Sequence, residues 1–278
     1  MRDRPAPSIG EEPTVLVVAN ADEAAAVATT RIATALTDAV AKRGQADWAT
    51  SGGSSVVGIY RRLAARPLRD AIPWAGVHVW WGDDRYVPRD HPQSNVKPLD
   101  DILLAIGPSE EGTAGRGGAG VPLPLGNLHP FRTGEAIGGS RGPDWCAAAL
   151  ADELTAARVP TEGSWPAFDL VLLGVGADGH VLSVFPGSAA IGASALAMAI
   201  PAPSHIEPRV DRVTLNPAVI GAARAVLVVA TGAAKAPVLA EVFGYSLDPT
   251  RWPAQLARRA AATWILDAAA AASLPRRA

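Results

Sequence analysis

The chain has 278 residues, of which 49% are hydrophobic and 19% charged, and its formal net charge is -2. This composition is ordinary for a soluble globular protein, and the balanced charge gives no indication of a nucleic-acid or membrane partner. Cys146 is the only cysteine, which excludes an intramolecular disulfide and a structural zinc site built from thiolates.

The polar N-terminal stretch 1–12 predicts a flexible tail. The first apolar run, Thr14–Ala19, is too short for the core of a secretory signal, and no apolar run approaches the roughly 20 residues of a membrane span. We therefore expect a cytoplasmic protein. The polar, glycine-rich stretch 107–120 predicts a loop insertion, and without a repeat or linker elsewhere, residues 13–278 predict a single α/β domain.

Apolar runs and helical spacing predict elements that alternate along the chain. In chain order they are a strand at Thr14–Ala19, a helix at Asp22–Ala41, a strand at Ala46–Thr50, a helix at Ser54–Ala65, a strand at Val77–Trp81, helices at Pro92–Ile106 and Gly142–Arg158, strands at Phe168–Gly174, Ala195–Ile200, Arg209–Leu215 and Arg224–Ala230, helices at Ala233–Phe243 and Trp252–Ala262, a strand at Thr263–Leu266 and a helix at Asp267–Ala272.

Several of the predicted strands are continuous apolar runs, which is typical of strands that are buried on both faces. Together with the alternation of strands and helices, this predicts an open, mostly parallel sheet with helices on both faces, a Rossmann-like three-layer α/β sandwich. Ligands of such sheets bind outside the carboxyl ends of the strands. The residues that directly follow each strand are therefore the candidates for a functional site.

The first such segment is Ser51-Gly-Gly-Ser-Ser55, which precedes a predicted helix. Gly52 and Gly53 would let the backbone approach an anion closely, and a helix start offers free N–H groups. Ser54 and Ser55 would add hydroxyl donors. The alternative is that Ser54 merely caps the helix, and the residues by themselves do not decide between a phosphate cradle and a cap.

Cationic residues follow two further strands. Arg85, in Gly82-Asp-Asp-Arg85, offers a planar guanidinium for a phosphate or carboxylate, with Asp83 and Asp84 either holding it or binding a substrate. Lys235 stands in the first turn of a predicted helix, where a positive charge is unfavourable unless an anion is bound. For each residue the alternative is an ordinary solvated charge at the surface.

The segment Gly174-Val-Gly-Ala-Asp-Gly-His180 follows the most strand-like run of the chain. Histidine is the usual general acid–base residue near neutral pH, and the histidines at 78, 91, 129 and 205 have no comparable setting. The four strand ends together predict a pocket with a cationic clamp and His180 as acid–base residue. Whether Asp178 contacts His180 or only shapes the turn stays open at this point, because side chains two apart in a turn often diverge.

These segments, in this order, resemble the 6-phosphogluconolactonase family, which is related to the glucosamine-6-phosphate deaminases. The matching blocks are SGGSS (51–55), WWGDDRYVPRDHPQSN (80–95), LVLLGVGADGHVLSVFPGS (170–188), RVTLNPAVIGAARAVLVVATGAAKA (209–236) and ATWILDAAAA (262–271). The resemblance implies hydrolysis of the lactone of 6-phosphogluconate, a sugar-phosphate substrate, in the oxidative pentose phosphate pathway, without a cofactor or metal.

The resemblance also implies roles for individual residues. His180 would be the catalytic acid–base residue, with Asp178 shaping its loop and Arg85 able to steady the oxyanion. Arg85, Lys235 and the Ser51–Ser55 loop would bind the phosphate. The chain departs from the common family pattern at Asp84, Val181 and Ser55, where Glu, Thr and Thr are usual. The family's contacts at the positions of Asp84 and Ser55 therefore do not carry over directly to this chain.

Two alternatives remain. The deaminase relatives carry Phe-Asn-Glu-Pro after Asp-Gly-His, whereas this chain has Ser183-Val-Phe-Pro186, which disfavours ring opening of an amino sugar. A sugar-phosphate-binding regulator without catalysis is the other alternative, but the sequence contains no DNA-binding helix pair or basic tail. We expect a monomer or a weak homo-oligomer with no nucleic-acid or membrane partner.

Overall fold

The structure, a computed structural model, describes residues 12–107, 115–116, 120–244 and 246–275. The predicted tail 1–12 and the predicted loop 107–120 therefore lie mostly outside the described residues. At the borders of that loop, β5 (Ile106–Gly107) pairs antiparallel with β6 (Gly115–Arg116). Among the described helices, none has the length and apolar character needed to cross a membrane.

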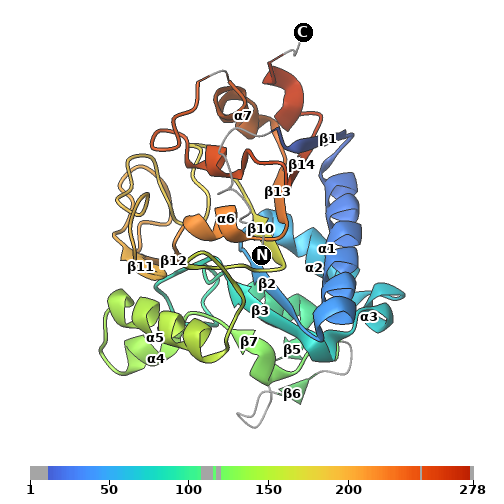
Figure 1. The fold of residues 1–278 in the computed structure, drawn as a ribbon, viewed down its shortest axis with the longest axis vertical. Helices are drawn as coiled ribbons and strands as arrows, with labels where there is room; N and C mark the ends of the chain where they lie inside the picture. Colours follow the sequence, from blue (N-terminus) through green and yellow to red (C-terminus); the bar gives the residue numbers. More distant parts are fainter. Residues whose placement is uncertain (1–11, 108–114, 117–119, 245, 276–278) are drawn as a thin grey trace.

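Seven strands form one sheet at the centre of the molecule, and every neighbouring pair in it is parallel (Figure 1). This confirms the predicted fold class. The continuous apolar runs are indeed covered on both faces, since β10 and β13 are buried at every residue. The order across the sheet is β1 (Thr14–Val18), β14 (Ala262–Asp267), β13 (Val226–Ala230), β10 (Leu170–Leu173), β2 (Ala46–Thr50), β3 (Val77–Trp81) and β7 (Leu128–His129).

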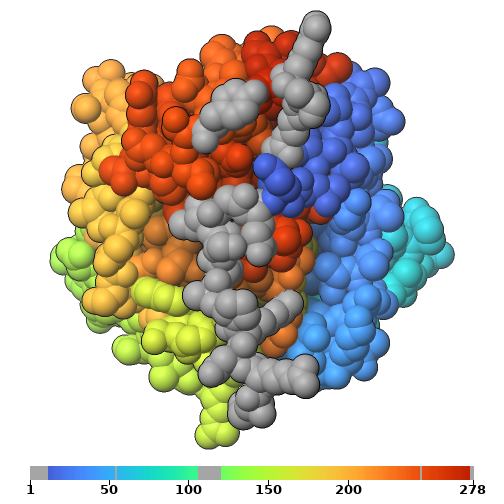
Figure 2. Space-filling view, turned by 45° about the horizontal axis from the view of Figure 1, so that its top comes forward, coloured from blue at the N-terminus to red at the C-terminus, as the bar shows by residue number. Residues whose placement is uncertain are grey.

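Helices pack on the sheet from both sides. On one side α1 (Ala21–Arg43) contacts β2, β10, β13 and β14, and α2 (Ser54–Ala64) packs beside it; Figure 1 shows α6 on the other side. The first strand of the chain, β1, pairs with the last, β14, so the blue and red parts of the chain adjoin in Figure 2. The remaining helices are α3 (Leu68–Ala71), α4 (Thr133–Gly138), α5 (Pro143–Ala156), α6 (Ala218–Ala222) and α7 (Ala236–Val242).

Two of the predicted strands do not join the parallel sheet. β11 (Ala197–Ile200) and β12 (Arg212–Leu215) pair antiparallel, and β12 pairs in turn with β4 (Asp83–Arg85). The apolar pattern predicted the strands but not their partners. The consequence for the site is that Arg85 is held in a strand rather than in a free turn. The strands β8 (Thr161–Glu162) and β9 (Trp165–Pro166) pair with each other in a small antiparallel hairpin.

The predicted helix Pro92–Ile106 is wrong in its first part. Helical structure begins only at residue 97 and continues through the π-helical turn η2 (Leu99–Leu103), because Ser94 and Asn95 are bound in a turn: the Asn95 N–H donates to Asp84 Oδ1 at 2.7 Å and the Ser94 hydroxyl lies 3.3 Å from Asp84 Oδ2. A buried carboxylate here satisfies donors that a helix would have used internally.

The helices predicted at Trp252–Ala262 and Asp267–Ala272 form only in part and not as α-helices. The structure has the shorter 3-10 helices η5 (Pro253–Ala257) and η6 (Ala270–Ser273) there. Asp267 instead ends β14, and its carboxylate accepts from the Gly232 and Ala270 N–H groups. The predicted helix Ala233–Phe243 starts with a 3-10 turn, η4 (Ala233–Lys235), before α7, and two further 3-10 turns are η1 (Trp74–Gly76) and η3 (Leu125–Asn127).

The strand order contains one point at which the chain reverses its direction of travel across the sheet. From β2 it proceeds to β3 and β7 at one edge, and from β10 it proceeds through β13 to β14 in the opposite direction. β2 and β10 are neighbours at this reversal. In open α/β sheets the crevice outside the carboxyl ends at such a switch point is where ligands bind.

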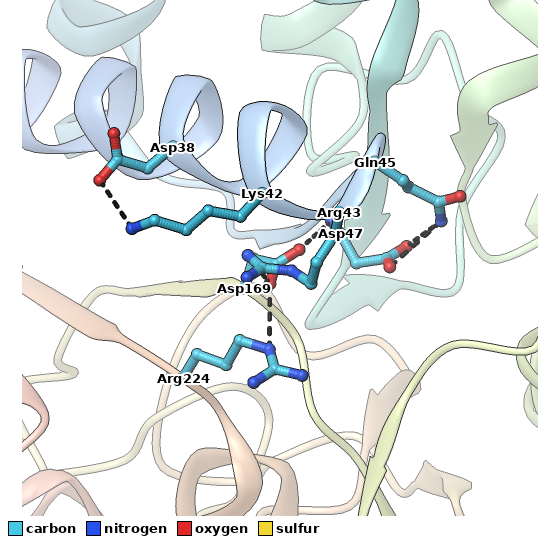
Figure 3. A network of polar contacts seen from close by, with 7 residues as sticks. All are labelled: Asp38, Lys42, Arg43, Gln45, Asp47, Asp169 and Arg224. Carbon is cyan, nitrogen blue, oxygen red and sulfur yellow. Dashed lines mark hydrogen bonds and ion pairs between the residues drawn. The ribbon is translucent and has the colours of Figure 1, made fainter.

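A polar network ties β2 and β10 together at their amino ends (Figure 3). Asp169, just before β10, accepts from the Asp47 N–H at 2.9 Å and pairs with Arg43 at 2.6 Å and Arg224 at 3.2 Å. The Asp169 side chain is only 7% exposed, so its loss leaves a buried N–H group without an acceptor. The network therefore fixes the two strands whose opposite ends form the switch point.

We expect Asp169→Ala to lower the free energy of unfolding by about 1–3 kcal/mol, the usual cost of leaving a buried donor unsatisfied. The matched control is Asp38→Ala, because Asp38 pairs with Lys42 at 3.3 Å on the exposed surface of α1 (Figure 3), where such pairs contribute about 0–1 kcal/mol. Urea denaturation of both variants measures the difference. Equal effects would show that the network does not stabilise the sheet.

Candidate active site

A cavity of about 310 Å³ opens at the carboxyl ends of β2, β3, β10 and β13, four strands that are consecutive in the sheet. Its volume suits a small ligand. The cavity thus lies at the switch point between β2 and β10. Its lining brings together most of the residues predicted from the four strand ends: Gly52, Gly53, Ser55, Arg85, His180 and Lys235.

The Ser51–Ser55 loop leads into the N-terminus of α2. Gly53 occupies the N-cap position with φ 90°, so the alternative in which Ser54 occupies the cap position is wrong. Ser54 is the first residue of α2, and its side chain lies outside the described part of the structure. A Cβ atom on Gly52 would lie 1.9 Å from Asn95 Oδ1, so this position requires glycine.

Arg85 reaches the cavity from the end of β4. Its Nη1 donates to the backbone carbonyl of Gln93 at 2.7 Å, which fixes the guanidinium. Its Nε is buried and has no hydrogen-bond partner within the described residues. A guanidinium that is held by one bond and retains other donors is well suited to an anionic ligand.

The two carboxylates before Arg85 have different surroundings. Asp84 is fully buried and accepts from the N–H groups of Arg85 and Asn95 at 2.8 and 2.7 Å, and burial raises the pKa of Asp84 to about 7. Asp83 lines the cavity and accepts from the Ser183 hydroxyl at 2.6 Å. Asp84 therefore shapes the loop that carries Arg85, while Asp83 joins that loop to the segment after His180.

Asp178 contacts His180 directly, which the sequence left open. Asp178 Oδ1 lies 2.6 Å from His180 Nδ1 and also accepts from the His180 N–H at 3.2 Å. Burial opposes ionisation of Asp178, but the hydrogen bonds and the charge interaction with His180, together with His205, lower the pKa of Asp178 below its usual value. Because an ionised carboxylate only accepts, His180 carries its proton on Nδ1 and its Nε2 is left as a base.

Two glycines make this contact possible. A Cβ on Gly176 would lie 2.0 Å from His180 Nδ1 and 2.4 Å from Asp178 Oδ1. Gly179 has φ 85°, and a Cβ there would lie 2.9 Å from the Trp252 ring. The segment turns so tightly over its own side chains that only glycine fits at these positions. From the sequence the segment is expected to turn, but the sequence does not show that Gly176 leaves room for the Asp178–His180 pair.

The sequence did not predict a place for His205 in the site. Its Nε2 lies 2.8 Å from Asp178 Oδ2, so Asp178 binds two histidines, one with each oxygen. The expectation that the histidines other than His180 have no comparable setting is wrong for this residue. His205 lies in the stretch 201–208, for which the sequence predicts neither a helix nor a strand, and only its long-range contact with Asp178 reveals its place.

Lys235 lies at the end of η4 and lines the cavity. Burial lowers the pKa of Lys235, and the nearby Asp178 carboxylate opposes that effect. A partly desolvated ammonium group gains more from a bound anion than a fully hydrated one does. The Gly232 N–H group at the start of this turn is not free to bind an anion, because it donates to Asp267 at 3.0 Å.

The family model described as "Glucosamine-6-phosphate isomerases/6-phosphogluconolactonase" matches residues 19–265. The chain is 34% identical over 270 residues to a 6-phosphogluconolactonase of Streptomyces coelicolor, covering 96% of this chain and 97% of that one. It is 35% identical over 259 residues to a 6-phosphogluconolactonase of Mycobacterium tuberculosis, covering 92% and 96%.

Solved structures agree with these sequence relatives. The 6-phosphogluconolactonase of Trypanosoma brucei superposes with a TM-score of 0.79 at 27% identity, covering 95% of this chain and all of that one. A monomeric glucosamine-6-phosphate deaminase superposes with a TM-score of 0.73 at 13% identity, over 94% of this chain and 99% of that one, which shows a shared fold alone. By sequence and by fold, the chain belongs to the glucosamine-6-phosphate isomerase/6-phosphogluconolactonase family.

Proposed function

We propose that this protein hydrolyses 6-phospho-D-glucono-1,5-lactone to 6-phospho-D-gluconate. The observation that carries the proposal is the Asp178–His180 pair, which leaves a basic Nε2 on a histidine that lines the same cavity as Arg85 and Lys235. A base and two cations in one small cavity match a substrate with a reactive carbonyl at one end and a phosphate at the other. The sequence relatives named above carry the same activity in their names.

In the proposed complex, the phosphate binds to Arg85, Lys235 and the backbone around Gly52, Gly53, Ser54 and Ser55 at the start of α2. This anchors the sugar so that its C1 carbonyl faces His180. The phosphate does not react, so its binding energy serves to orient the lactone.

The chemical step then needs one base. His180 Nε2 removes a proton from a water molecule as its oxygen forms a bond to C1. Backbone N–H groups stabilise the oxyanion of the tetrahedral intermediate, since Arg85 is engaged with the phosphate. The bond from C1 to the ring oxygen breaks, and the His180 imidazolium returns the proton to that oxygen. Asp178 stays ionised throughout and holds the imidazole in its orientation. No step of this scheme requires a metal or cofactor.

The experiment that tests the function is release of acid from the lactone by the purified protein, with spontaneous hydrolysis subtracted. Release of ammonia from glucosamine 6-phosphate is measured beside it. Lactone turnover without ammonia release would support the proposal. Ammonia release would support the deaminase alternative, which the run Ser183-Val-Phe-Pro186 disfavours, because it contains neither the Asn nor the Glu of the deaminase pattern.

We expect Lys235→Ala to raise the KM for the lactone about tenfold with a smaller change in kcat, because Lys235 is proposed to bind the unreactive phosphate. Lys42→Ala is the control, since Lys42 pairs with Asp38 on the exposed face of α1. Steady-state kinetics of both variants measure the effect. A fall in kcat with an unchanged KM would contradict the phosphate role of Lys235.

Further properties belong to the same proposal. Residues 13–278 act as a single catalytic domain, the site needs no partner subunit, and the protein works in the cytoplasm as a monomer or weak homo-oligomer. The support for a single domain is that one continuous hydrophobic core joins the helices and strands on both sides of the cavity. Size-exclusion chromatography with light scattering tests the oligomeric state.

A further inference from the structure

Asp178 sits between two histidines, and only one of them belongs to the proposed mechanism. Asp178 Oδ1 binds His180 Nδ1 at 2.6 Å, and Asp178 Oδ2 binds His205 Nε2 at 2.8 Å. Both histidine nitrogens must donate, because an ionised carboxylate only accepts. The Phe185 ring packs against both histidines, with its centroid 4.8 Å from that of His180 and 5.8 Å from that of His205. His205 therefore has a defined place beside the catalytic pair.

The segment that carries His205 also forms one wall of the cavity. Ile206 and Glu207, the next two residues, both line it. The two ends of the segment are fixed by Asp211: its side chain accepts from the Ala202 N–H at 2.9 Å, and its carbonyl accepts from the Tyr86 N–H at 2.8 Å. Between these ends, the His205–Asp178 bond joins the segment to the loop that carries His180.

We propose that His205 is a positioning residue: it holds the second oxygen of Asp178, so that the first stays on His180 Nδ1, and it anchors the 201–211 segment as a wall of the substrate cavity. The proposal rests on the proposed lactonase function. A carboxylate bound at one oxygen can rotate about its last side-chain bond, and the second hydrogen bond removes that freedom. Loss of His205 should therefore affect turnover through Asp178 and substrate binding through Ile206 and Glu207.

Three variants test this at His205 and its segment. We expect His205→Leu, which removes the donor, to lower kcat/KM about tenfold, the size typical of residues in one hydrogen-bond network, through a lower kcat and a higher KM. His205→Gln should restore kcat/KM to within a few fold of wild type, because its amide can donate to Asp178. Ser204→Ala is the matched control and should keep the wild-type kcat/KM, since Ser204 is exposed on the same segment and does not line the cavity. An unchanged kcat/KM in His205→Leu overturns the proposal.

A double-mutant cycle separates a role through Asp178 from a role of the segment alone. In the Asp178→Ala background, adding His205→Leu should lower kcat by no more than about twofold, because the group through which His205 acts is already gone. The full effect of His205→Leu on kcat in that background would overturn the proposal. Spontaneous hydrolysis of the lactone is subtracted in every measurement.

A measurement that needs no turnover keeps this proposal separate from the proposed function. In ¹⁵N-labelled protein, His205→Leu should shift the imidazole nitrogen resonances of His180, and Asp178→Ala should shift those of both histidines. Ring nitrogens of His180 that do not respond to His205→Leu overturn the positioning role. Absence of lactone hydrolysis by the wild-type protein would overturn the proposed function instead, whatever the resonances show.

Discussion

Replacing His180 with alanine should lower kcat for the lactone by about a hundredfold or more, the usual contribution of a positioned general base. The reason is that Nε2 of His180 is the atom left to accept a proton from water once Asp178 holds the proton on Nδ1. KM should change little, because the phosphate contacts proposed for Arg85 and Lys235 are intact. Steady-state kinetics measure both constants.

The same variant should keep its fold. In His180→Ala, Asp178 still accepts the backbone N–H of residue 180 and the His205 side chain, so no buried charge is left without partners. Thermal unfolding should therefore remain close to that of the wild type. The control is His78→Ala, which removes a histidine bound to His129 away from the cavity; it should leave kcat unchanged. Near-wild-type turnover in His180→Ala would remove the basis of the mechanism.

The sequence predicted the sheet and the location of the site because both depend on local patterns. β10 and β13 are short apolar runs that cannot be placed anywhere but in the interior, and in a parallel sheet their carboxyl ends necessarily meet at one edge. The residues just after them, His180 and Lys235, were therefore predicted to share a pocket, and both line the cavity.

What the sequence did not predict depends on contacts between distant segments. The first part of the helix expected at Pro92–Ile106 does not form, because the buried Asp84 carboxylate binds Ser94 and Asn95, and nothing in the local spacing predicts that bond. His205 joins the site from a segment without periodicity, 27 residues after Asp178 along the chain. Local patterns therefore predicted which edge of the sheet carries the site. The side chains that orient the site residues could be identified only from the three-dimensional structure.

Gly176 offers the sharpest test of that orientation. We expect Gly176→Ala to lower kcat about a hundredfold, comparable to the loss expected from a misplacement of about 1 Å in a catalytic group. The added Cβ would lie 2.0 Å from His180 Nδ1 and 2.4 Å from Asp178 Oδ1, far closer than atoms can approach. One of these two side chains must leave its position, and their hydrogen bond is then lost. KM should change less than kcat, because Gly176→Ala alters none of the side chains proposed to bind the phosphate.

The fall in kcat of Gly176→Ala should come from the clash of the new Cβ with His180 and Asp178, and not from a change in backbone conformation. Gly176 is not among the glycines with positive φ, so its backbone conformation is open to alanine. Gly138→Ala is the matched control, since a Cβ on Gly138 in α4 meets no atom within 4 Å; its kcat should equal that of the wild type. A Gly176→Ala enzyme with wild-type kcat would mean that turnover does not depend on the Asp178–His180 hydrogen bond, and His180 would then have to act without a carboxylate holding its tautomer.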